Sequence, residues 1–284
     1  MKTRSAGSWS EHRMVSFDKT PLFYRHLTPE NKCRATALIL HGNGEHGGRY
    51  GEFAEFLAQN GVESWIPDVR GYGQSGGARA SLRHFRDYYR DLDGIYSQIC
   101  RVSGDARLFL VGHSNGGLTL ASWLAATPEL RCRGLVLSSP NFGIAIQVPR
   151  WQHLAAMLGA YVLPDLTLSN RVDTTKLTHD TRLLQLSKKD RLIHLRVSLG
   201  LYRELTHELT RVDAIAACIH CPALVLQAGQ DHIVSRAATV RFFEQLRSTD
   251  KELKIYEDLY HELLNETERP AIYARIGGWM EQRL

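Results

Sequence analysis

The stretch that decides the fold is LFLVGHSNGGLTLASWL, residues 108–124. Four apolar residues typical of a strand come first, then the turn GHSNG at 112–116, then a run that favours a helix. A serine at the tip of such a turn, between two glycines, is typical of a nucleophile elbow. The glycines are needed because side chains at their positions would collide with the neighbouring strand and helix. The pattern predicts that Ser114 is a nucleophile.

A serine nucleophile needs a base, and the base must be oriented by a carboxylate. Asp231 follows the predicted strand 223–227, and His261 follows the predicted strand 253–256. Both positions lie at the carboxyl ends of strands, and the order serine, acid, histidine is the one found with such elbows. We therefore predict that Ser114, Asp231 and His261 form a catalytic triad.

Other titratable residues near these positions are weaker candidates. His232 comes before the last strand, and His113 adjoins the serine but should point in a different direction. Glu257 and Asp258 are alternatives for the acid. Both lie just before the predicted base, however, and would orient its ring from the wrong side.

Two main-chain N–H groups are predicted to bind the oxyanion that forms during attack. Asn115 begins the helix after Ser114, so its N–H can face a developing negative charge. The second donor should come from the loop after the strand 37–40. In that loop, HGNG at 41–44, the N–H of Asn43 is the best candidate.

The rest of the chain alternates short apolar strands with helices. After an opening hairpin within 14–26, the predicted strands cover 37–40, 62–67, 108–111, 135–137, 223–227 and 253–256. The predicted helices cover 50–60, 84–101, 115–127, 235–247 and 267–283. This alternation indicates an α/β fold, with a mostly parallel, eight-stranded sheet and helices on both faces.

Residues 143–216 break the alternation, because they contain several helical patterns and no convincing strand. We predict a helical lid inserted above the carboxyl edge of the sheet, where ligands bind in open α/β folds. The core would then consist of residues 1–142 and 217–284. Most apolar residues of 144–168 should pack the lid onto the core, and a minority should line an apolar pocket.

Composition excludes several classes of partner. The formal net charge of +5 over 284 residues includes no Lys/Arg block, so nucleic acid is not expected as a partner. Weak attraction to anionic lipid remains open, and through the lid it would allow transient contact with a membrane surface. The longest apolar stretch, 154–163, is too short to span a bilayer.

Cysteine usage and the N-terminus predict a cytoplasmic protein. Residues 1–8 carry positive charge without a following apolar core, so no signal peptide is expected. Five scattered cysteines fit reduced thiols better than a disulfide framework. Cys218 and Cys221 have C-x-x-C spacing, but no second pair completes a zinc site. We expect neither a metal nor an organic cofactor.

Several segments resemble the monoacylglycerol lipase group of α/β-hydrolases, also labelled lysophospholipases. HGNGEHGGRY at 41–50 resembles that group's HGxGEHxxRY segment, and DVRGYGQS at 68–75 matches its DxxGxGxS loop. GHSNGG at 112–117 matches its GHSxGG elbow, and 253–262 looks like its segment around the catalytic histidine. The agreement extends from about residue 12 to the C-terminus.

The resemblance implies an α/β-hydrolase fold with a helical lid and a serine hydrolase of monoacylglycerol or lysophospholipid esters. It assigns the triad to Ser114, Asp231 and His261, and the oxyanion donors to Asn43 and Asn115.

The chain departs from the group at both oxyanion positions. The group usually carries a small or apolar residue at 43 and Met or Leu at 115, whereas this chain has Asn at both. The main-chain donors survive that change, but side-chain amides facing the cleft could favour short or polar acyl groups. A general carboxylesterase for short or polar acyl esters is therefore an alternative. A catalytically silent, hydrolase-like ligand-binding protein is a further alternative, of a different class. A lyase, transferase or peptidase with the same triad also remains open, because a fold does not determine a reaction.

Overall fold

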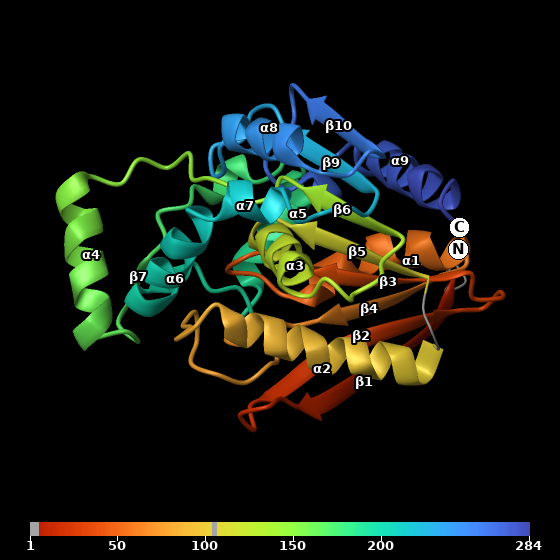
Figure 1. The fold of residues 1–284 in the computed structure, drawn as a ribbon, viewed down its shortest axis with the longest axis horizontal. Helices are drawn as coiled ribbons and strands as arrows, with labels where there is room; N and C mark the ends of the chain where they lie inside the picture. Colours follow the sequence, from red (N-terminus) through yellow and green to blue (C-terminus); the bar gives the residue numbers. More distant parts are fainter. Residues whose placement is uncertain (1–5, 104–106) are drawn as a thin grey trace.

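A mostly parallel sheet of eight strands forms the centre of the molecule (Figure 1). The computed structural model describes residues 6–103 and 107–284. Residues 1–5, part of the stretch predicted to lack a signal peptide, lie outside the described residues. The strands of the sheet are β1 (Gly7–Val15), β2 (Pro21–Pro29), β3 (Ala35–Leu40), β4 (Val62–Pro67), β5 (Leu108–His113), β6 (Gly134–Ser138), β9 (Ala223–Ala228) and β10 (Lys251–Tyr256).

The spatial order of the strands is β1-β2-β4-β3-β5-β6-β9-β10. Strand β2 is antiparallel to β1 and β4, and the remaining neighbours are parallel. Strands β3, β4, β5, β6 and β9 are buried along their whole length. Burial on both faces explains why most of these strands are short, nearly continuous apolar runs. Strand β4 is the exception, because it buries Glu63, which pairs with His26 of β2. The predicted fold class is confirmed.

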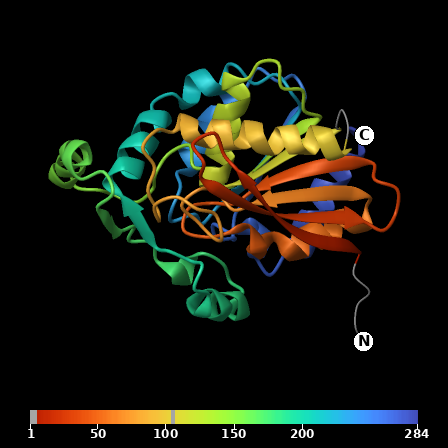
Figure 2. The same cartoon turned by 90° about the horizontal axis from the view of Figure 1, so that it is seen from below.

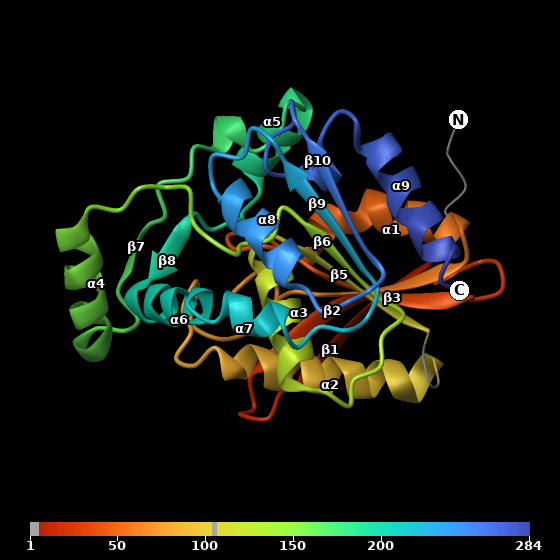
Figure 3. The same cartoon turned by 45° about the horizontal axis from the view of Figure 1, so that its top comes forward.

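Helices cover both faces of the sheet. They are α1 (Gly51–Gln59), α2 (Arg86–Ser103), α3 (Asn115–Ala126), α8 (Arg236–Gln245) and α9 (Arg269–Glu281), with short 3₁₀ turns η1 (Gly47–Tyr50) and η3 (Leu263–Asn265). One apolar cluster joins α2, α3 and α8 to the sheet, and a second joins α1 and α9 to the opposite face. Figure 3 shows α1 and α9 on one side and α2 and α3 on the other.

The segment between β6 and β9 contains both helices and strands. Its elements are α4 (Arg150–Val162), β7 (Thr167–Ser169), η2 (Thr174–Lys176), α5 (Thr181–Lys189), β8 (Arg196–Ser198), α6 (Leu199–Leu209) and α7 (Val212–Ala216). The expectation of no strand was wrong, because β7 and β8 pair antiparallel in a second, two-stranded sheet. Three-residue strands are too short to show an alternating pattern, and α5 separates the two partners in sequence.

Helix α4 corrects a second expectation, that most apolar residues of 144–168 pack onto the core. Figures 1 and 2 both place α4 at the outer end of the molecule, away from the sheet. The helix packs against α6, and Ala160 alone of its residues is buried. Six large apolar side chains on α4 and at its C-terminal cap are 56–78% exposed: Trp151, Leu154, Leu158, Tyr161, Val162 and Leu163. Among the helices of the described residues, none has both the length and the apolar character to cross a membrane.

Candidate active site

Ser114 lies at the turn between β5 and α3, with φ 51° and ψ −121°. A positive φ is strained for a residue with a side chain, and it persists only where the surroundings hold it. The flanking glycines are required by contact distances. A Cβ at Gly116 would lie 2.3 Å from the Leu40 oxygen, and one at Gly112 would lie 2.6 Å from the Gly117 Cα. The turn therefore needs glycine on both sides of the serine.

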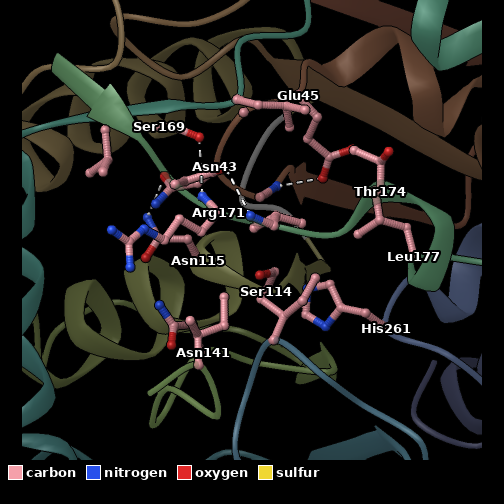
Figure 4. Close-up of a pocket in the computed structure, with 18 of the residues that line it drawn as sticks. Asn43, Glu45, Ser114, Asn115, Asn141, Ser169, Arg171, Thr174, Leu177 and His261 are labelled. Carbon is pink, nitrogen blue, oxygen red and sulfur yellow. Dashed lines mark hydrogen bonds between the residues drawn. The ribbon is translucent and has the colours of Figure 1, made fainter. Parts of the chain in front are cut away.

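The structure brings His261 and Asp231 together, with 2.7 Å between Nδ1 and Oδ2. The other Asp231 oxygen accepts hydrogen bonds from the N–H groups of Ile233 and Val234, both at 2.9 Å. A carboxylate can only accept, so Nδ1 of His261 carries the proton and Nε2 remains the basic nitrogen. Figure 4 shows Ser114 beside His261, and both residues line one cavity.

The paired side chains shift each other's pKa. Burial raises the pKa of Asp231, but His261 and the main-chain donors outweigh it, so the pKa lies below its ordinary value. Burial likewise lowers the pKa of His261, but the Asp231 carboxylate outweighs it and holds the pKa above its ordinary value. His113, whose ring centroid lies 4.7 Å from that of His261, differs: burial and the neighbouring His261 lower its pKa to about 4. His113 is therefore a neutral packing partner at pH 7.

The remaining candidates for base and acid are exposed. His232 is exposed, and its ring lies edge-on to Tyr260 at 6.1 Å. Glu257 forms two hydrogen bonds with Arg236, at 2.6 and 2.9 Å. Asp258 is exposed. Of the three candidate acids, Asp231 is therefore the one that contacts His261.

Asn43 and Asn115 meet beside Ser114, although they come from different elements. Asn43 follows β3 and Asn115 begins α3, and Nδ2 of Asn115 donates to Oδ1 of Asn43 at 3.0 Å. Within the described part of the chain, no acceptor is found for the main-chain N–H of either residue. Because buried N–H groups are rarely left unpaired, two unpaired donors beside a serine suit an anion.

A buried ionic network behind the histidine escaped the sequence reasoning. Arg49 donates to Glu45 at 2.7 Å and to both oxygens of Glu262, at 2.7 and 2.6 Å. The Tyr50 hydroxyl also donates to Glu45 at 2.7 Å. Burial raises the pKa of Glu45, but Arg49 and the nearby histidines lower it to about 2. The signal was a Glu and an Arg four residues apart in HGNGEHGGRY, but the second carboxylate that Arg49 binds, Glu262 next to His261, lies far along the chain.

These residues line a cavity of about 740 Å³ between the carboxyl edge of the sheet and the segment 143–216. The wall around Ser114 is polar. The wall formed by the segment 143–216 is mainly apolar, with Ile144, Ile146, Val148, Leu168, Leu184, Ile193, Leu195, Val197, Leu199 and Leu205. The segment also contributes polar side chains to the lining: Gln152, Ser169, Asn170, Arg171, Thr174, Ser187, Lys188, Asp190, Ser198 and Tyr202. Within residues 6–103 and 107–284, no group of three or more His, Cys, Asp or Glu side chains could hold a metal ion.

Known proteins with similar sequences cover nearly the whole chain. The family described as serine aminopeptidase, S33, matches residues 31–268. Monoglyceride lipase of Mus musculus is 31% identical over 281 residues, covering 95% of this chain and 90% of the mouse protein. Phospholipase YtpA of Bacillus subtilis is 29% identical over 249 residues, covering 87% of this chain and 95% of the bacterial protein.

The chain is also similar to part of a longer protein and to a protein of known structure. The chain spans 29% of the length of an uncharacterized abhydrolase domain-containing protein of Dictyostelium discoideum, to which it is 29% identical over 276 residues. The crystal structure of Paleococcus ferrophilus monoacylglycerol lipase superposes with a TM-score of 0.83 at 25% identity, covering 98% of this chain and all of that one. The chain therefore belongs to the serine aminopeptidase S33 family and, among α/β-hydrolases, to the group that resembles monoacylglycerol lipases.

Proposed function

We propose that this protein is a serine hydrolase that cleaves carboxylic esters of lipid-like substrates, of the monoacylglycerol or lysophospholipid class. The observation that carries the proposal is the His261–Asp231 pair beside Ser114, at the polar end of a cavity with a largely apolar far wall. An apolar wall suits an acyl chain, and the polar end suits the reacting carbonyl.

The first half-reaction forms an acyl-enzyme. Nε2 of His261 takes the hydroxyl proton of Ser114 as the serine oxygen bonds to the ester carbonyl carbon. The carbonyl electron pair moves onto oxygen, and this oxyanion accepts hydrogen bonds from the N–H groups of Asn43 and Asn115. Each such donor stabilises the transition state by about 3 kcal/mol. The bond to the alcohol oxygen then breaks, and His261 returns its proton to the leaving alcohol.

The second half-reaction regenerates the serine. His261 removes a proton from water, whose oxygen attacks the acyl carbon of the ester on Ser114. The tetrahedral intermediate collapses with transfer of the proton from His261 to the serine oxygen, and the carboxylic acid leaves. Asp231 keeps the imidazole in the required tautomer throughout. The cycle needs no metal or organic cofactor.

We propose that the segment 143–216 is the lid of this site, between core segments 1–142 and 217–284. Its residues form the apolar wall of the cavity, and its outer helix α4 exposes a large apolar face. Exposed apolar surface of this kind supports transient contact with a membrane surface, from which a lipid ester could enter. The five free thiols support a reducing, cytoplasmic location.

One observation favours a second candidate, a carboxylesterase for short or polar acyl groups. Asn43 and Asn115 place side-chain amides in the cavity wall next to Ser114. Such amides make this part of the wall more polar than apolar side chains would.

Labelling with a fluorophosphonate probe tests the serine mechanism. Wild type should be labelled and Ser114→Ala should not, because the probe needs an activated hydroxyl. Turnover of monoacylglycerols, lysophospholipids, p-nitrophenyl esters of increasing chain length and aminoacyl anilides then distinguishes the substrate classes. Absence of labelling in the wild type would refute a serine hydrolase. Faster turnover of the anilides than of every ester would refute an esterase.

A further inference from the structure

The two residues whose N–H groups face the oxyanion position are also joined through their side chains. Asn43 and Asn115 lie 72 positions apart, and Nδ2 of Asn115 donates to Oδ1 of Asn43 at 3.0 Å. We call this hydrogen bond the Asn43–Asn115 clamp. Figure 4 shows both asparagines on the side of Ser114 away from His261.

The buried carboxamide of Asn115 does not favour the stability of the folded state. Asn115 is 4% exposed, and its Oδ1 has no hydrogen-bond partner among the described residues. A buried carboxamide oxygen without a partner destabilises the folded state, whereas an apolar side chain of similar volume would not. The amide therefore points to a requirement other than stability.

The other hydrogen bonds found for the loop that carries Asn43 do not reach the elbow around Ser114. Gly42 N donates to Glu45 Oε1 at 2.7 Å, and Gly42 O, in the peptide unit that carries the Asn43 N–H, contacts His41 Nδ1 at 2.7 Å. Gly44, which follows, has φ 83° and accepts from His194 N at 2.9 Å. For Asn43, which lies between them, no main-chain hydrogen bond is found in the described part of the chain. The clamp is thus the contact that ties Asn43 directly to the elbow.

We propose that the Asn43–Asn115 clamp positions the two oxyanion donors relative to each other, so that both N–H groups converge on one oxygen. The inference rests on the proposed function, in which those groups bind the oxyanion. Donors contribute fully only when they lie 2.7–3.1 Å from the oxyanion. Asn115 is anchored at the start of α3, and the loop bonds at Gly42 and Gly44 do not reach that helix, so the clamp can hold Asn43 in register with Asn115.

Kinetics of Asn43→Ala, Asn115→Leu and the double variant test the clamp, with a soluble ester as substrate. Both substitutions keep the main-chain N–H groups. Loss of a whole donor lowers kcat about 10²–10³-fold, and a misplaced donor costs less, so we expect a fall in kcat on the order of tenfold. KM should change less than twofold. The double variant should be no slower than the slower single variant, because either change breaks the same bond.

A tetrahedral inhibitor separates positioning from a structural role. A trifluoromethyl ketone adds to Ser114 and places an oxyanion between the two donors. Its inhibition constant should rise by the same factor by which kcat falls. The inhibition constant of the product alcohol, which places no anionic oxygen between the donors, should stay within twofold of wild type. Asn60→Ala is the matched control, because Asn60 is exposed and bonds Phe56 O at the end of α1, away from the cavity.

Several outcomes would overturn the clamp. Multiplicative losses in the double variant, losses confined to KM, or unchanged inhibition by the ketone would each refute it while leaving the proposed function intact. Wild type without Ser114-dependent turnover would refute both. If Asn115→Leu fails to fold, Asn43→Ala decides alone through its kcat and its ketone inhibition constant, because Asn43 is only half-buried.

Discussion

Replacing Arg49 with methionine tests the buried ionic network behind His261. Arg49→Met keeps the apolar stem and removes the guanidinium that joins Glu45 to Glu262. The three side chains are at most 13% exposed, so two buried carboxylates would lose their counter-charge. Breaking a buried ion pair by removing one partner costs about 3–5 kcal/mol.

That cost converts into a shift of the melting temperature. An unfolding entropy of about 2.1 cal/mol/K per residue, over 284 residues, amounts to roughly 0.6 kcal/mol/K. The Tm of Arg49→Met should therefore be about 5–8 °C below that of wild type at pH 7.5.

The deficit should depend on pH. In wild type, burial acts to raise the pKa of Glu45, but Arg49 and its other neighbours lower it to about 2. Its stabilisation is therefore present above the ordinary carboxyl pKa and is lost as the pH falls toward 2. Without Arg49, burial raises the pKa of both carboxyls, which then take up protons on acidification. The Tm difference from wild type should shrink between pH 7.5 and pH 5.

Differential scanning calorimetry at the two pH values measures both effects. Arg34→Met is the matched control, because Arg34 makes the same two-bond contact with Glu281, at 2.8 and 2.7 Å, on the exposed surface. Exposed pairs contribute little, so its Tm should stay within about 2 °C of wild type. A fall of less than 2 °C for Arg49→Met at pH 7.5, or a deficit independent of pH, would refute the reasoning.

Three further predictions concern the base, the elbow and the outer helix. Asp231→Asn should lower kcat about 10⁴-fold and move the acid limb of the pH–rate profile to lower pH, because the pKa of His261 loses the carboxylate that raises it. Gly116→Ala should lower the free energy of unfolding in urea, because its Cβ would meet a main-chain oxygen at 2.3 Å. Gly278→Ala in α9 meets nothing within 4 Å and should raise that free energy by about 0.5–1 kcal/mol. Trp151→Glu on the exposed face of α4 should weaken co-sedimentation with lipid vesicles and leave kcat on a soluble ester unchanged.

Each of these predictions has a contrary outcome. An acid limb that stays in place in Asp231→Asn would show that the carboxylate does not set the pKa of the base. Equal unfolding free energies for the two glycine variants would contradict the close approach at the elbow. Vesicle binding that survives Trp151→Glu would remove α4 as the membrane-contacting surface.

Much of the fold could be predicted because its signals are local. Strand β9 begins at the predicted residue, 223, and ends one residue beyond the predicted 227, because a buried parallel strand needs only a short apolar run between turn residues. The elbow around Ser114 was equally readable, because its glycines and flanking elements are contiguous. Chain order and the ends of two strands indicated Asp231 and His261, which the structure joins at 2.7 Å. Their catalytic roles remain predictions.

The sequence by itself thus determined the α/β sheet and which side chains stand at its carboxyl edge, while the tertiary structure decided how those side chains pair. The β7–β8 pairing, the contact of Arg49 with Glu262 and the Asn43–Asn115 clamp join segments that are distant in the chain. The tertiary structure also decided that the apolar face of α4 is exposed. An apolar pattern marks a helix face that favours burial, but it does not show whether a neighbour covers that face. Burial and hydrogen-bond partners depend on packing in space, which no local pattern encodes.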